Sequence, residues 1–269
     1  MGKIPAGKFL DSNSATFSWS VLVASWKQRA YIGPQIHPQL MDLNLEGRSA
    51  LVCGSSQGIG LATAIELSEL GATVCLFARN EERLKESLKK LKRPAGQKHH
   101  YLLADFSKAQ EVGTVIQEAI ASGARFEILV NNTGGPPGGK ISEANIEEFR
   151  IAFNNHLINN HQLAQACIPG MKASGYGRII NIISTSVKIP LNGLGVSNTV
   201  RGAVANWSKT MANELGQFNI TVNNVLPGAT NTLRLTTIVE NKAKKSDQST
   251  EEVIDQMAAA VPMNRIGEA

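Results

Sequence analysis

The chain has 269 residues, of which 42% are apolar and 18% charged, and its formal net charge is +5. A chain of this size and composition can bury one good-sized core, so we expect a single folded domain. The densest basic run, residues 85–100, lacks a reader motif and aromatic residues, so we predict a solvated helix face and no nucleic-acid partner. No apolar run approaches the roughly 18 residues that span a bilayer, so no membrane partner is expected.

The first forty residues fit none of the patterns that follow them. They contain neither a cleavable secretory signal nor the Ser or Thr that a myristoylation site requires. We predict a poorly ordered extension at 1–40 and a folded domain at 41–269. Three cysteines, Cys53, Cys75 and Cys167, show no metal spacing and no disulfide framework, so we expect reduced core residues of a cytoplasmic protein and no metal site.

From Arg48 the chain alternates short apolar runs with longer helical periodicities, which is typical of βαβ units around a parallel sheet. Each run is nearly continuous in apolar residues, as strands covered on both faces require. Six strands are predicted, at 49–54, 72–78, 100–105, 126–132, 178–184 and 220–226. Helices are predicted at Ile59–Leu70, Glu81–Leu91, Lys108–Ala121, Ile146–Met171 with a break, and Ser197–Leu215. The fold class is therefore α/β, a doubly wound Rossmann sheet in three α/β/α layers.

Beyond Pro227 we predict an irregular polar stretch and then a final helix at Glu251–Ala260. No seventh strand follows before Ala269, so the C-terminal strand of such a sheet is missing from the pattern. The sixth strand would then be an unprotected apolar edge. On this basis we expect the chain to be a C-terminally incomplete fragment.

The first strand runs into the segment CGSSQGIG, in which Gly54, Gly58 and Gly60 open the first helix. Glycines allow a tight turn there, close approach of the backbone to a pyrophosphate, and packing of the helix on the sheet. This strand–turn–helix context favours a dinucleotide site over a plain turn. At the end of the second strand an acidic residue would bind the ribose of NAD, whereas this chain has Arg79. NADP is therefore the predicted cofactor, with NAD possible.

Two further motifs, NNTGG at Asn131–Gly135 and PGATNT at Pro227–Thr232, complete a resemblance to the short-chain dehydrogenase/reductase family. The chain is similar to the subgroup of 3-oxoacyl-carrier-protein reductases from about Leu43 onward. The resemblance implies that Asp105 touches the adenine and that a homodimer forms through the helices at 146–171 and 197–215, with a tetramer doubtful. The cofactor-binding residues it implies are Gly54, Ser56, Gln57, Gly58, Ile59, Gly60, Arg79, Asp105, Phe106, Asn131, Asn132, Gly134, Arg201, Pro227, Gly228 and Thr232.

The resemblance also locates an active site, and there the sequence departs from the family. Ser184 matches the family's Ser after the fifth strand, but the Tyr expected thirteen residues later is Ser197. The Lys that should follow is Arg201, and the family's Asn in the long helix is His156. These four residues are the candidate catalytic set.

A Ser hydroxyl is shorter and far less acidic than a phenol with a pKa of about 10, so Ser197 is a poor proton donor. Arg201 stays protonated and can hold the cofactor ribose. His156 can titrate near neutrality and is a candidate acid, although a lone His on a helix is more often structural.

Two functions remain open at this point. The first is an NADP(H)-dependent oxidoreductase that interconverts a carbonyl compound, 3-oxoacyl or small ketone, and an alcohol. Loss of a general acid costs about 10²- to 10⁴-fold in rate, and hydride transfer belongs to the cofactor, so turnover can survive the substitutions. The second is a nucleotide-binding protein without turnover, used in regulation or assembly.

Overall fold

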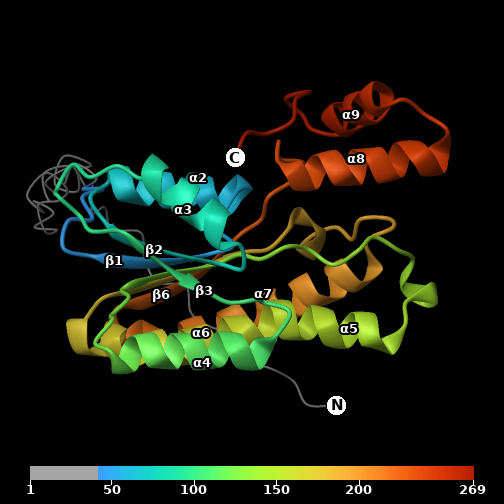
Figure 1. Ribbon diagram of the computed structural model, residues 1–269. Coiled ribbons are helices and arrows are strands. Elements are labelled where there is room, and N and C mark those ends of the chain that lie inside the picture. The colour runs from blue at the N-terminus through green and yellow to red at the C-terminus, as the bar shows by residue number, and fades with distance from the viewer. Residues whose placement is uncertain (1–41) are drawn as a thin grey trace, which may run out of the picture. The chain divides into compact units, whose positions relative to one another are not determined.

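Six parallel strands form one sheet in the computed structural model, which describes residues 42–269 (Figure 1). The strand order is β3-β2-β1-β4-β5-β6, so the direction of winding reverses between β1 and β4, where open α/β sheets bind ligands. The strands are β1 Ser49–Cys53, β2 Thr73–Ala78, β3 His100–Leu103, β4 Ile128–Asn131, β5 Gly177–Ile182 and β6 Ile220–Val225. Each bound falls within two residues of its predicted position, which confirms the predicted fold class. The predicted extension at 1–40 lies outside the described residues.

Helices cover both faces of the sheet. In Figure 1, α2 and α3 lie on one face, while α4, α6 and α7 lie on the other. Successive side chains of a strand point to opposite faces, so Leu51 of β1 enters the core under α4 and α6, and Val52 enters the core under α2 and α3. The helices are α2 Gly58–Glu69, α3 Glu81–Lys90, α4 Ala109–Ala121, α5 Ile146–Phe153, α6 Asn159–Ser174, α7 Gly195–Leu215, α8 Leu233–Ser246 and α9 Thr250–Ala259.

The three cysteines lie in the core on the α6 side of the sheet. Within residues 42–269, Cys53, Cys75 and Cys167 are buried and free of disulfides. Burial raises the pKa of each thiol, that of Cys167 to about 12, so all three are protonated and unreactive at neutral pH. Their predicted role as reduced core residues is confirmed, whereas the cytoplasmic location stays a prediction.

The break predicted within 146–171 takes the form of a π turn that interrupts the α-helix without ending it. The helix continues from α5 through a π turn at Asn154–Ile158 into α6, and the backbone keeps right-handed helical angles at both junctions. A π turn widens the helix locally without ending it, and such turns occur frequently at functional sites. The run of polar residues at 154–156 resembles a helix end in the sequence, but here it marks the widened turn that carries His156.

The segment after β6 is also more regular than predicted, because 233–246 forms α8. Its apolar stripe is narrow: Val239 and Ala243 are its buried residues, and they pack with Val253 of α9. The rest of the helix is polar, so its periodicity is weak in the sequence. The Thr232 hydroxyl caps the start of the helix by accepting a hydrogen bond from the Leu235 backbone N–H at 3.3 Å.

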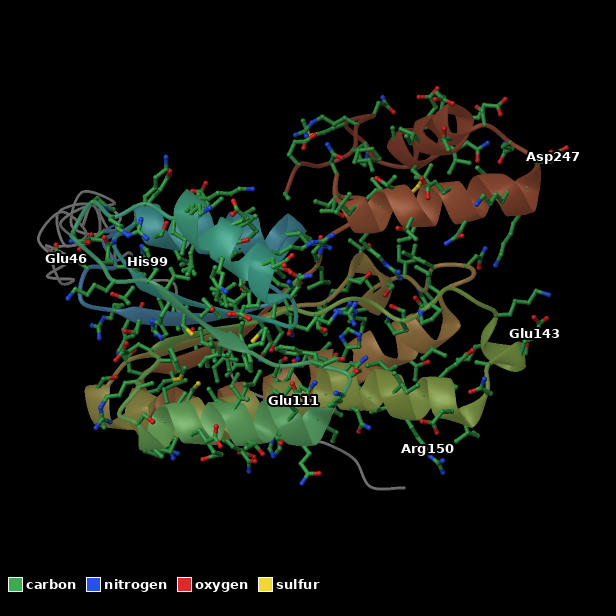
Figure 2. The ribbon with its side chains drawn as sticks, viewed as in Figure 1. Glu46, His99, Glu111, Glu143, Arg150 and Asp247 are labelled. Carbon is green, nitrogen blue, oxygen red and sulfur yellow. The ribbon has the colours of Figure 1, made fainter. Side chains whose placement is uncertain are left out.

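Within residues 42–269, β6 pairs only with β5 and is an edge of the sheet. The final residues return toward the loop before α8, where Gly267 forms an isolated bridge with Thr230. Charged side chains such as Glu143, Arg150 and Asp247 point outward (Figure 2). None of the helices described in this part of the chain is both long and apolar enough to cross a membrane. The homodimer through the long helices stays a prediction.

Candidate active site

The glycine turn between β1 and α2 leaves no room for side chains. Gly54 and Gly58 have φ values of +58° and +55°, which favour glycine. A Cβ on Gly54 would lie 2.7 Å from the Asn132 backbone oxygen, and a Cβ on Gly60 would overlap the Gly54 carbonyl oxygen. The Asn132 amide Nδ2 donates to the Cys53 and Gly54 carbonyl oxygens at 3.2 and 3.3 Å. Asn132 therefore ties the end of β4 to the turn.

The N-terminus of α2 is open to an anion. Within the described chain, Gln57 at the N-cap makes no side-chain capping bond, and no acidic residue lies in the first turn. The positive end of the helix dipole and the first-turn backbone N–H groups, which have no acceptor within the helix, therefore lie directly after the glycine turn. The turn and this helix start fit the pyrophosphate of a dinucleotide cofactor.

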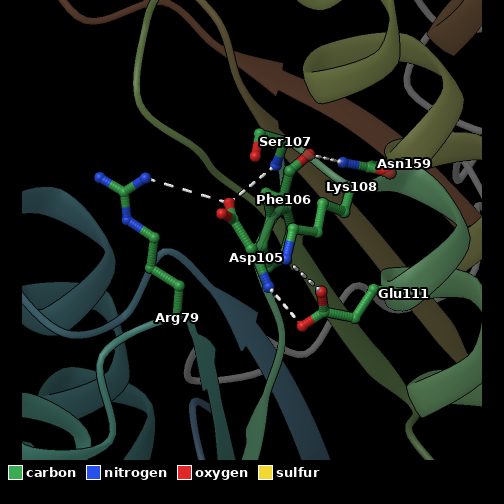
Figure 3. Close-up of polar contacts among 7 residues, drawn as sticks. All are labelled: Arg79, Asp105, Phe106, Ser107, Lys108, Glu111 and Asn159. Atoms are coloured by element: carbon green, nitrogen blue, oxygen red, sulfur yellow. Dashed lines mark hydrogen bonds and ion pairs between the residues drawn. The ribbon is translucent and has the colours of Figure 1, made fainter.

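Two predicted cofactor residues lie side by side at the neighbouring strand ends. An Arg79 Nη1 atom is 3.9 Å from Asp105 Oδ1, and Figure 3 shows the two side chains facing each other after β2 and β3. The Ser107 backbone N–H donates to Asp105 Oδ1 at 3.0 Å and lowers the pKa of this carboxyl. The Arg79 side chain is 75% exposed, so it is free to turn toward a ligand.

Phe106 contributes through its backbone and its ring. The ring packs edge-on against Phe77 with centroids 5.1 Å apart, and the carbonyl oxygen accepts a hydrogen bond from Asn159 Nδ2 at 2.7 Å (Figure 3). These contacts hold the loop that carries Asp105. Sequence reasoning missed Arg83 nearby, whose Nη1 donates to the Gln57 Oε1 atom at 2.8 Å. Its spacing of four residues from Arg79 was the available signal.

Other predicted cofactor residues hold the strand ends and loops around the site in place. Asn131 points into the sheet, where its Nδ2 donates to Asn181 Oδ1 at 2.8 Å. The Pro227 carbonyl oxygen accepts from the Thr185 backbone N–H at 3.1 Å and joins the ends of β5 and β6. Thr232 borders the glycine turn, since a Cβ on Gly58 would lie 3.2 Å from its methyl group.

The remaining backbone contacts concern Ser56, Ile59 and Gly228. Their carbonyl oxygens accept hydrogen bonds from Ser87, Thr63 and Thr230 side chains, respectively. Each contact fixes a loop or turn of the predicted site.

Ser184 and Arg201 both lie beyond the end of β5, where Arg201 bonds with the Ile182 carbonyl oxygen. Ser184 is partly buried, and its Oγ accepts from the Ser186 backbone N–H at 3.1 Å. Ser197 and Arg201 are four residues apart in α7 and share one face of the helix. The Arg201 Nη1 atom donates to the Ile182 carbonyl oxygen at 2.7 Å, while its Nε is buried without a hydrogen-bond partner among residues 42–269.

His156 is held neutral. The residue is 3% exposed, and within the described chain its Nε2 has no hydrogen-bond partner. Burial, followed by the charge of Arg201, lowers the pKa of His156 to about 3, although a hydrogen bond with the Gly134 backbone opposes the shift. The lowered pKa disfavours the predicted titration of His156 near neutrality, and a catalytic role for this side chain stays a prediction. A neutral imidazole can still donate or accept a hydrogen bond.

Sequence reasoning missed a second arginine at the site, Arg234 in the first turn of α8. Its Nη2 donates to the Pro136 carbonyl oxygen at 2.7 Å. A Cβ on Gly135 would lie 3.5 Å from Arg234 Nη2 and 3.6 Å from Arg201 Nη2, so both guanidinium groups approach the same loop. Burial, followed by the charge of Arg234, lowers the pKa of Arg201 to about 10. The sequence carries no signal for Arg234 as long as 229–250 is interpreted as irregular.

Comparison with known proteins gives consistent relatives. Residues 48–243 match the family described as short chain dehydrogenase. The NADPH-dependent reductase BacG of Bacillus subtilis is 30% identical over 224 residues, which cover 82% of this chain and 86% of the relative.

Solved structures give the same picture. L-sorbose reductase from Gluconobacter frateurii, complexed with NADPH and L-sorbose, has a TM-score of 0.77 at 30% identity. The match covers 85% of this chain and 87% of the reductase. A variant of the actinorhodin polyketide ketoreductase with NADPH has a TM-score of 0.75 at 31% identity, and the match covers 82% of this chain and 85% of the ketoreductase.

Proposed function

Because the chain belongs to the short chain dehydrogenase family, we propose that it is an NADP(H)-dependent oxidoreductase that interconverts a carbonyl compound and an alcohol. The observation that carries the proposal is the place of Arg201. This side chain is anchored to the Ile182 carbonyl oxygen beyond β5, with an unused buried Nε, at the same edge of the sheet as the glycine turn. A ketone or a 3-oxoacyl group is the proposed substrate class.

NADP is the proposed cofactor. Relatives of this chain are described as NADPH-dependent or were solved with NADPH. Arg79 stands after β2, where an arginine accommodates the 2′-phosphate, and its exposed side chain is restrained only by the contact with Asp105 at 3.9 Å. Arg83 lies four residues further on, at the start of α3, and can add a second positive charge.

Ser184 and Arg201 act on the carbonyl group in the proposed mechanism, and Ser197 passes the proton. The Ser184 hydroxyl donates a hydrogen bond to the carbonyl oxygen of the substrate. The charge of Arg201 stabilises the negative charge that develops on that oxygen, and stabilisation of this kind often accounts for most of the rate enhancement in such reactions. When bound, the reduced nicotinamide supplies the hydride that the carbonyl carbon accepts.

The proton comes from water, because Ser197 is too weak an acid to lose its proton outright. The Ser197 hydroxyl gives its hydrogen to the alkoxide as it takes one from a water molecule, which leaves the alcohol and a hydroxide that solvent neutralises. Neutral His156 keeps its position behind Arg201 and takes no part in net proton transfer.

Turnover is the experiment that tests this function. We expect NADPH oxidation, followed by nicotinamide absorbance, with at least one member of a panel of ketones, oxo acids and 3-oxoacyl thioesters. Ser184→Ala should lower kcat by about 10²-fold and leave NADPH affinity within about twofold, because it removes a group that acts on the developing oxyanion. The matched control is Ser122→Ala, at the exposed C-terminus of α4. NADPH binding without turnover of any member of the panel would instead favour the nucleotide-binding role.

A further inference from the structure

Three basic side chains from distant parts of the chain converge on the loop at 134–136. His156 of the π turn lies near the Gly134 backbone, which raises its pKa, and Arg234 of α8 bonds with the Pro136 carbonyl oxygen. Arg201 of α7 approaches Gly135 between them. Both arginine Nη2 atoms lie near the same point of Gly135, so their separation cannot exceed the sum of 3.5 and 3.6 Å.

No acidic side chain balances these charges. Among residues 42–269, neither Arg201 nor Arg234 has a carboxylate oxygen within 4.0 Å. The charge of Arg234 contributes to the lowered pKa of both Arg201 and His156. Arg201 is partly buried and Arg234 is exposed, so water screens the two charges in part. Like charges this close are nevertheless unfavourable unless an anion joins them. Arg234 also lies in the first turn of a helix, where the dipole disfavours a cation.

The donors left over match one planar anion. Arg201 uses Nη1 on the Ile182 carbonyl oxygen, which leaves Nε and Nη2 along one edge of the guanidinium. Two parallel N–H donors on one edge bind both oxygens of a carboxylate. Arg234 uses Nη2 to bond with the Pro136 carbonyl oxygen. Its other N–H donors can bind the same anion from the opposite side.

The cofactor has a separate place for its pyrophosphate. The open N-terminus of α2 follows β1, whereas the basic cluster lies on segments that follow β4, β5 and β6. In the proposed reaction Arg201 and Ser184 already face the reacting carbonyl group. An anion held between Arg201 and Arg234 would therefore belong to the molecule that carries this carbonyl.

We propose that the substrate is an oxo acid, whose carboxylate is held between Arg201 and Arg234 while its carbonyl group faces Ser184. The inference rests on the proposed function for the reduction step but not for carboxylate binding. It narrows the substrate class from carbonyl compounds in general to those with a free carboxylate close to the carbonyl carbon.

The first arm of the test compares acetoacetate with its neutral methyl ester, both with NADPH. We expect kcat/KM to be at least tenfold higher for the acid. Arg234→Gln should lower kcat/KM for the acid at least tenfold more than for the ester, mainly through KM, because any effect of losing its bond to the Pro136 loop is common to both substrates. Arg234→Lys should recover part of the loss, because it restores the charge but not the planar fork. The matched control is Lys242→Gln, which removes an exposed charge from the same helix.

The second arm needs no turnover. Malonate is titrated calorimetrically into the protein saturated with NADP+, and NADPH affinity is measured separately for each variant. We expect malonate binding that Arg234→Gln weakens at least tenfold and Lys242→Gln leaves unchanged, with NADPH affinity within twofold throughout.

The outcomes separate the two proposals. Arg234-dependent malonate binding without reduction of any carbonyl compound would support the carboxylate site and contradict the proposed function. Equal reduction of acid and ester by the wild type, with no discrimination in Arg234→Gln, would overturn the carboxylate site and leave the function standing. Loss of NADPH affinity in Arg234→Gln would also overturn it, because the arginine would then serve the cofactor.

Discussion

Replacing Arg201 by Met is expected to make the folded protein more stable while it removes activity. Burial, and then the charge of Arg234, lower the pKa of Arg201 to about 10. At neutral pH the Arg201 guanidinium is protonated in both the folded and the unfolded chain. The folded state therefore carries the full cost of this charge below about pH 10. Met keeps much of the aliphatic stem and removes the charge.

The magnitude follows from two opposing effects. The lowering of the Arg201 pKa corresponds to a cost of about 3 kcal/mol at 1.4 kcal/mol per tenfold change in the acid constant. The variant loses the hydrogen bond from Nη1 to the Ile182 carbonyl oxygen, and a bond from a charged donor contributes about 2 kcal/mol. The expected net gain is about 1 kcal/mol, which raises Tm by about 3 °C for a domain of this size.

Thermal unfolding followed by circular dichroism measures this shift, with Arg178→Met as the control. Arg178 also donates to backbone carbonyl oxygens, those of Gly177 and Asn219, and it stacks 4.1 Å over the Tyr176 ring outside the site. Its replacement should lower the free energy of unfolding by about 1–2 kcal/mol, because bonds and stacking are lost. If Arg201→Met lowers Tm by more than about 3 °C, Arg201 is a structural residue and the cost assigned to its charge is wrong.

Three further predictions concern the cofactor, the pH dependence and the missing phenol. Arg79→Asp should erase or reverse a preference for NADPH over NADH; equal affinity of the unchanged protein for both cofactors would show that Arg79 is merely solvated. Since the pKa of His156 is about 3, kcat should show no imidazole titration between about pH 5.5 and 8, while the unfolding free energy should fall by up to about 1.4 kcal/mol per pH unit below about pH 6 as the unfolded state takes up the proton. A kcat limb near the usual pKa of His that disappears in His156→Asn would contradict this assignment. The pair Ser197→Tyr with Arg201→Lys should raise kcat for a neutral ketone by about 10²-fold if the pocket has room for the ring, and an unchanged kcat would show that it does not.

The sheet could be predicted because its strands are encoded locally. Each buried strand is a continuous apolar run, and covering a parallel sheet on both faces requires nothing more specific. The helix α8 could not be predicted in the same way, because its buried residues are Val239 and Ala243, which pack against Val253 of α9. Helix stability that depends on a partner element leaves a weak periodic signal in the sequence.

The site was only partly predictable for a related reason. Motif spacing identified Ser184, Ser197, Arg201 and His156 as candidates, and the structure brings them to one end of the sheet. Spacing does not encode the environment of a side chain. The low pKa of His156 depends on burial and on the charges of Arg201 in α7 and Arg234 in α8. Arg234 lies 78 residues after His156 in the sequence.

The distribution of charge distinguishes this cluster from the rest of the described surface. Elsewhere within residues 42–269, Lys85 pairs with Glu81 at 2.8 Å, and Arg150 pairs with Glu147 at 3.5 Å, both in helices exposed to water. Such pairs form readily on exposed helices and contribute little to stability. Arg201 is partly buried, with an unpartnered Nε, and faces the cation Arg234 in place of an acid; this arrangement is unfavourable, and a fold alone does not need it. An anion that enters with the substrate would cancel this cost only in the complex, so the energy lost in the free protein would return as affinity for that substrate.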